Sequence, residues 1–172
     1  MARVSTKTGI ANLTASLLKV NAVTSIEPPD KNSKFATKAA QWYDEARREV
    51  LADHVWNFAV KRVQLPAAAD TPAFGYGQKF LLPSDYIRVA TIGDEDDPET
   101  DYKVEDGHIL SDITAPMDLR YVFDQEDVTK FTPNFIQLFA RKLAVYLAYD
   151  MTGNRSMVQQ MEESDRKSTR LN

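Results

Sequence analysis

The feature that most constrains the fold of this chain is the spacing of its apolar residues, which changes twice. Apolar residues recur every three or four positions before Trp56, alternate with polar residues over about 57–124, and return to helical spacing at Pro133. This order gives two helices, a group of strands and two more helices, without the alternation of a doubly wound sheet. We therefore expect an α+β fold, a helical bundle of three to four helices with an inserted small antiparallel β-sheet region, in a single domain over 1–172.

Capping residues locate most of the helices, which are predicted at about 9–20, 34–55, 133–152 and 155–167. Thr8 is the expected N-cap of the first helix and Ser33 that of the second. The third helix opens at Thr132-Pro133 and stops at Gly153, a residue type that readily takes the left-handed conformation of a helix end.

The second helix has one apolar face and one charged face. Its predicted buried stripe steps by three or four residues through Phe35, Ala39, Trp42, Ala46 and Val50. The other face carries Asp44, Arg47 and Arg48, whose spacing suits ion pairs on a solvated surface. The second helix and the Pro133 helix both present broad apolar faces, so we expect them to pack together.

The middle of the chain reads as a four- to five-strand sheet region, the β-rich insertion of about 57–124. The sharpest signal is Asp106-Gly107, which supplies the positive φ angles that a two-residue hairpin turn requires. Strands are predicted at 57–65, 86–92, 102–105, 108–110 and 117–123, and 79–82 is an optional short strand.

Residues that carry enzyme or metal chemistry are scarce in this sequence. There is no cysteine, and His54 and His108 are the two histidines. Neither a Gly-x-Ser-x-Gly element nor a completed phosphate loop occurs, because Gly75-Tyr76-Gly77 lacks the rest of such a motif. We predict no catalytic residue, no metal site and no cofactor. No membrane-spanning segment or secretion signal is evident, so synthesis in a cytoplasm is expected.

The dense run of acidic residues at 94–101 is the one feature that packing within the fold does not explain. The chain has a formal net charge of −4, which disfavours tight DNA binding. A solvated loop tip is the default interpretation. A wall that faces DNA without adhering to it is the functional alternative, and a calcium loop is less favoured because the full ligand pattern is missing. The acidic residues are Asp94, Glu95, Asp96, Asp97, Glu99 and Asp101.

Several motifs, taken in order, resemble the tail tubular protein A family of podovirus-type phages, which are head-to-tail adaptor proteins. The resemblance covers about residues 10–152. Its pieces are Ile26-Glu27-Pro28-Pro29, Trp42-Tyr43-Asp44-Glu45-Ala46-Arg47, Trp56-Asn57-Phe58-Ala59, Leu65-Pro66, Leu82-Pro83-Ser84-Asp85-Tyr86, Leu119-Arg120-Tyr121-Val122 and the Pro133 helix. Members of the family continue past the last helix, whereas this sequence stops at Asn172.

The resemblance implies a non-enzymatic virion protein, a subunit of a dodecameric ring that joins the portal protein to a downstream tail or nozzle protein. Such a ring would extend the channel for double-stranded DNA without binding it tightly. The six acidic residues are then channel-facing candidates, and the last predicted helix supplies the partner-docking candidates Arg155, Met157, Met161 and Arg166. The alternative is a small non-enzymatic regulatory or scaffold-like binding protein, and a hydrolase ranks a distant third.

Overall fold

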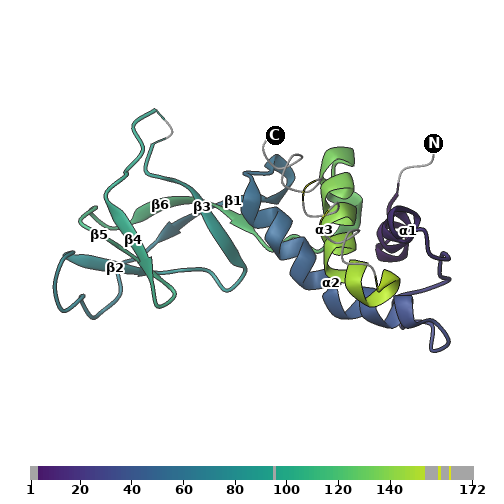
Figure 1. Cartoon of the computed structure of the whole chain (residues 1–172). Coiled ribbons are helices and arrows are strands. Elements are labelled where there is room, and N and C mark those ends of the chain that lie inside the picture. The colour runs from purple at the N-terminus through teal and green to yellow at the C-terminus, as the bar shows by residue number, and fades with distance from the viewer. Residues whose placement is uncertain (1–3, 95, 154–158, 160–162, 164–172) are drawn as a thin grey trace. The chain divides into compact units, whose positions relative to one another are not determined.

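The computed structural model describes residues 4–94, 96–153, 159 and 163. The chain divides into two compact units. One consists of Met1–His54 and Gln125–Asn172 and is called here the helical unit. The other, Val55–Asp124, is the β unit. Figure 1 shows the helices of the helical unit and the strands of the β unit.

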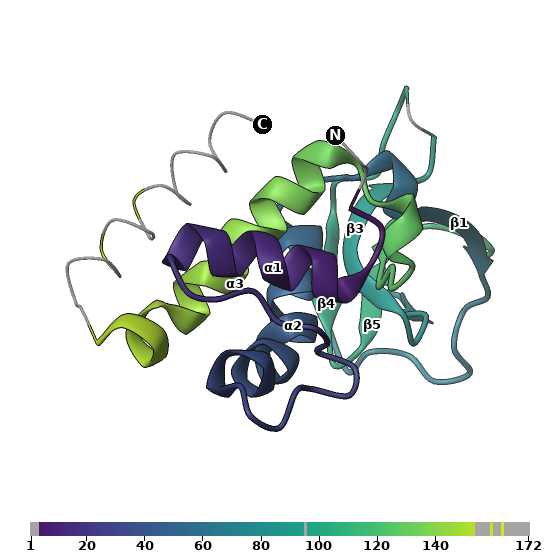
Figure 2. The same ribbon diagram turned by 90° about the vertical axis from the view of Figure 1, so that its right-hand side faces the viewer.

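The helical unit contains α1 (Lys7–Leu18), α2 (Lys34–Asp53) and α3 (Pro133–Thr152), with a short 3-10 helix at Val128–Lys130. Helix α3 packs against both α1 and α2, and Figure 2 shows α1 crossing it. The predicted packing of the second helix on the Pro133 helix is therefore confirmed. Aromatic rings fill much of the interior: Tyr43 meets Phe139 edge to face at 4.7 Å, and Phe131 lies 4.6 Å from Phe135.

The N-terminal ends of α2 and α3 follow the sequence, whereas α1 ends at Leu18 instead of about residue 20 and α2 at Asp53 instead of about residue 55. The hydroxyls of Ser33 and Thr132 accept hydrogen bonds from the backbone N–H groups three residues on, and Gly153 is left-handed at φ 63°, as predicted. The first helix is capped by Thr6 instead of Thr8, because the Thr6 hydroxyl accepts from the Gly9 N–H. Helix α1 therefore begins two residues before the predicted start.

The position of Arg47 differs from the one predicted for it on α2. It was expected on the solvated side, but its side chain is 1% exposed. It lies four residues after Tyr43 and four before Leu51, both of which are buried, so it belongs to the buried stripe. Its guanidinium pairs with Asp44 at 2.5 Å and with Glu126 at 3.7 Å. Trp42 is half-buried and stacks on Tyr146, with ring centroids 5.0 Å apart.

In the described part of the β unit, residues 55–94 and 96–124, six strands form two antiparallel sheets. The first sheet has the order β1-β6-β3 and the second the order β2-β5-β4. A 3-10 turn, Asn57–Ala59, precedes β1, so the predicted strand 57–65 is shortened at its start. The strands are β1 Val60–Leu65, β2 Gln78–Leu81, β3 Tyr86–Ile92, β4 Tyr102–Glu105, β5 His108–Ser111 and β6 Met117–Phe123.

The two sheets share one apolar core. Phe80 and Ile109 from the second sheet belong to the same buried cluster as Ile92, Leu119 and Tyr121 from the first. Alternate residues of β1 and β6 face this core, and Arg62, Gln64, Asp118 and Arg120 between them form the outer face of the first sheet. Val122 on the same side of β6 is fully buried, and two register shifts interrupt the alternation of β3. The predicted hairpin is confirmed: β4 and β5 pair around Asp106-Gly107, with φ angles of 45° and 69°.

The predicted architecture, a bundle of three to four helices with one small inserted sheet, is wrong. Residues 4–94 and 96–153 contain three α-helices and two separate three-stranded sheets, a mixed α+β arrangement. The physical reason lies in strand pairing between distant residues. β1 pairs with β6 and β2 pairs with β5, and no local sequence pattern specifies either pairing. The predicted helix at 155–167 falls outside the described residues, apart from Gln159 and Glu163.

Candidate functional site

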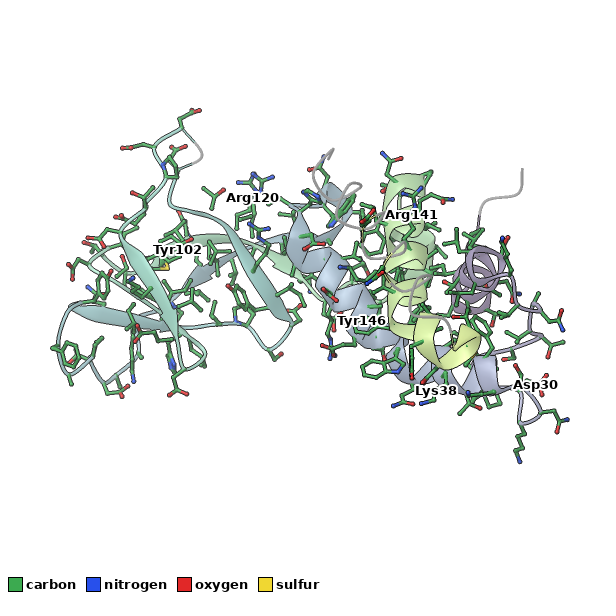
Figure 3. The ribbon with its side chains drawn as sticks, viewed as in Figure 1. Asp30, Lys38, Tyr102, Arg120, Arg141 and Tyr146 are labelled. Carbon is green, nitrogen blue, oxygen red and sulfur yellow. The ribbon has the colours of Figure 1, made fainter. Side chains whose placement is uncertain are left out.

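The outer face of the first sheet carries an open groove of about 630 Å³. Strand register places its polar side chains. Arg62 on β1 lies directly opposite Arg120 on β6, and Thr91 on β3 flanks Arg120 on the other side. The groove is lined by Arg62, Val63, Gln64, Thr91, Gly93, Asp94, Asp118, Leu119 and Arg120. Figure 3 labels Arg120 within the β unit.

Both positively and negatively charged side chains line this groove. Side chains directly opposite on antiparallel strands are neighbours, so Arg62 and Arg120 bring two guanidinium groups onto one patch. Arg88 lies on the same outer face, opposite Val122. Asp118 accepts a hydrogen bond of 2.8 Å from the Gln64 amide. The groove therefore combines two guanidinium groups with the carboxylates of Asp94 and Asp118, so its formal charges balance.

Apart from Asp94, sequence reasoning missed the residues that line this groove. Arg62 and Gln64 alternate with the core residues Val63 and Leu65, and Arg120 alternates with Leu119 and Tyr121. Period-two alternation alone would have placed them on the outer face. Their convergence on one patch depends on the pairing of β1 with β6.

The acidic run forms the loop between β3 and β4, which projects beyond those strands in Figure 1. Gly93 and Pro98 form an isolated bridge, and the Glu99 N–H donates to the Ile92 carbonyl at 2.9 Å. Asp94 accepts from the Asp96 N–H at 3.1 Å and Glu99 from the Asp101 N–H at 2.7 Å. Two of the candidate carboxylates thus help to fix the loop.

Exposure distinguishes the acidic residues from one another. Asp94, Asp96, Asp97 and Asp101 are exposed, whereas Glu99 is half-buried and Glu95 lies outside the described residues. Asp94 also lines the groove. Their channel-facing role stays a prediction.

Asp85 joins all three strands of the first sheet. It precedes β3, and its carboxylate accepts hydrogen bonds from Nζ of Lys61 on β1 at 2.5 Å and from the hydroxyl of Tyr121 on β6 at 3.0 Å. Burial alone would raise the pKa of Asp85, but these hydrogen bonds outweigh it and hold that pKa below its ordinary value. Burial and the neighbouring Asp85 together raise the pKa of Tyr121 to about 12.

A second polar cluster links α2 to α3. The carboxylate of Glu49 accepts from Nζ of Lys142 at 3.1 Å and from the hydroxyl of Tyr146 at 2.6 Å. The hydrogen bond to Glu49, together with burial, raises the pKa of Tyr146 to about 12. Lys38 on α2 pairs with Asp150 on α3 at 3.0 Å, and Figure 3 labels both Lys38 and Tyr146. These contacts hold the two helices together along their exposed edge.

The remaining residues considered in the sequence form no further site in the part of the chain that the structure describes. His108 lies at the hairpin, where its Nδ1 is 2.7 Å from the Asp106 carbonyl oxygen. No group of three or more His, Cys, Asp or Glu residues among the described ones is placed to hold a metal ion. No described helix is both long and apolar enough to cross a membrane. The docking candidates Arg155, Met157, Met161 and Arg166 lie outside the described residues.

No protein-family model and no curated protein matches this chain.

Proposed function

We propose that this chain is a structural subunit of a head-to-tail adaptor ring in a tailed bacteriophage, which links the portal to the tail and extends the DNA channel. The observation that carries the proposal is that residues of the motifs that resemble the adaptor family make contacts that stabilise the fold. Arg47 and Asp44 pair within the helical unit, and Asp85 connects the strands of the first sheet through Tyr121. These motif residues therefore stabilise the architecture, which supports a mechanical role.

The distribution of charge supports the same role. Val55–Asp124 contains 13 Asp and Glu against 6 Lys and Arg, a formal net charge of −7, while the rest of the chain contains 12 against 15, a net charge of +3. A negative wall repels a DNA backbone and lets it slide, because binding requires cations that displace counterions. The exposed acidic loop of the β unit is accordingly the proposed channel-facing element.

The ring would assemble on the portal protein and present its other side to a downstream tail or nozzle protein. The full chain, mixed with portal protein from the same phage genome, should co-elute with it in size-exclusion chromatography, and electron microscopy should show an added ring. A chain that stays monomeric or dimeric and never elutes with portal would contradict the proposal and favour a regulatory or scaffold-like binding protein.

A further inference from the structure

The two edges of the second sheet differ in how they are covered. β5 lies between β2 and β4, so these two strands form the edges of the sheet. The β2 edge is occupied, because the Ala68 N–H donates to the Lys79 carbonyl at 2.8 Å. On β4, no described residue forms a backbone hydrogen bond with the side that faces away from β5. Such an open edge is a template for pairing with another strand.

The Asp106-Gly107 turn determines which backbone groups of β4 point to this open edge. In a hairpin with a two-residue turn, the residues that flank the turn form a hydrogen-bonded pair, and such pairs then alternate along the ladder. Glu105 and His108 flank the turn, so the backbone of Glu105 points to β5. The N–H and C=O groups of Val104 and Tyr102 therefore point away from β5, and Figure 3 labels Tyr102.

The side chains of β4 divide between an apolar side and a charged side. Val104 pairs with the fully buried Ile109, so it lies on the core side of the sheet, yet it is 43% exposed. The core of the β unit is therefore uncovered at this edge. Lys103 and Glu105 alternate with Val104 and are exposed on the outer side. The same period carries Asp101 to that outer side.

Along the edge, the outer side of β4 has the charge order negative, positive, negative. This order is made by Asp101, Lys103 and Glu105. Lys103 and Glu105 form no ion pair with another described residue. Asp101 accepts a hydrogen bond of 2.9 Å from the hydroxyl of Tyr76, which is a neutral group. The three charges are therefore available to the side chains of an added strand.

This order of charge disfavours a pair between β4 and a second copy of itself. In the antiparallel register that uses all the free backbone groups, Val104 lies opposite Tyr102 of the second copy, and Lys103 then lies opposite its own counterpart. Like charges directly opposite each other destabilise a strand pair. A register centred on Val104 sets Lys103 opposite Glu105. It also sets Tyr102 opposite Asp106, a turn residue at φ 45° that ends the ladder.

We propose that β4 binds an extended segment of a partner protein as an added antiparallel strand, and that this segment carries a basic, an acidic and a basic residue at alternate positions. Its backbone pairs with the free groups of Tyr102 and Val104. Its charged side chains lie opposite those of Glu105, Lys103 and Asp101. Its intervening apolar side chains cover Val104 and extend the core. The inference applies equally to an adaptor subunit and to a scaffold-like binding protein, so it does not rest on the proposed function.

Labelled peptides test this inference by fluorescence anisotropy with the full-length chain. The matching peptide contains Lys-Val-Glu-Val-Lys, and the control contains Glu-Val-Lys-Val-Lys, which has the same composition and net charge in another order. We expect the matching peptide to bind about tenfold more tightly, because all its charged residues face opposite charges on β4. Methylating the backbone nitrogens of both its valines, which donate to β4, should abolish binding. Methylating the nitrogen of its glutamate, which points away from β4, should not.

The variant Lys103→Glu tests the charge order on the protein itself. Lys103 is exposed, so the variant should unfold at the wild-type temperature. Its edge carries only acids, against which each peptide places two lysines and one glutamate, so the two affinities should become equal. A preference that persists in this variant, or equal binding of both peptides to the wild-type chain, overturns the inference.

A second copy at the edge is the competing occupant. Val104→Pro removes the N–H that points to the open edge. Dimers of the wild-type chain that this variant does not form would show that β4 pairs with itself, which also overturns the inference. Ring formation on the portal is measured without any peptide, so a failure of the peptide experiment leaves the proposed function standing.

Discussion

Leu143→Ala should destabilise the helical unit strongly. Leu143 lies in α3 and is 0% exposed. The substitution removes three buried carbons, worth about 0.8 kcal/mol each in transfer free energy, and the residual cavity adds to this, so the expected loss of unfolding free energy is about 2–5 kcal/mol. Tyr149→Ala, on the same helix but 57% exposed, is the matched control and should change stability by less than about 0.5 kcal/mol.

Fluorescence can follow the helical unit alone, because the two tryptophans lie in different units. Trp42 belongs to the helical unit and Trp56 to the β unit. Urea unfolding in a Trp56→Phe background, read from Trp42, therefore reports the perturbed unit. If the Leu143→Ala protein unfolds at the same urea concentration as the protein with Leu143, the placement of α3 at the centre of this core is refuted.

Asp85→Asn should lower the unfolding free energy of the β unit by about 1–3 kcal/mol at pH 7, because Lys61 and Tyr121 lose a charged acceptor. The folded-state pKa of Asp85 is depressed, so its stabilisation is present above the ordinary aspartate value of about 3.9 and is lost as pH falls through the lower folded-state pKa. Urea unfolding read from Trp56 should show the two proteins converging at low pH, and a constant difference would count against the linkage. Arg47→Ala should cost about 1–3 kcal/mol more than Arg48→Ala in thermal unfolding, since Arg47 is buried and Arg48 exposed; equal midpoints would contradict this. Replacing the four exposed acids of the β3–β4 loop with lysine should preserve ring assembly but slow DNA release, with relief at high salt, and ejection at the wild-type rate would leave them as a solvated loop. The four are Asp94, Asp96, Asp97 and Asp101.

Local signals predicted the individual elements well. The Thr132 cap and Gly153 bound α3 as expected, Asp106-Gly107 closes its hairpin, and alternation located β6. Each of these depends on residues within a few positions of one another, which a sequence displays directly.

Long-range arrangement was not predictable in the same way. The pairing of β1 with β6 brings Arg62 opposite Arg120, although 58 positions separate them in sequence, and this pairing creates both the first sheet and the groove. Arg47 was misplaced for a different reason. Its spacing from Asp44 matches a surface ion pair, while its spacing from Tyr43 and Leu51 matches burial, and only packing decides between them.

The mass of a portal complex tests the central claim most directly. Light scattering of purified portal rings saturated with the chain should show a gain of about 230 kDa, which corresponds to a dodecamer of 19.4 kDa subunits around a closed ring. No gain in mass, or a gain equal to one or two chains, would contradict the assignment of this protein as an adaptor ring subunit.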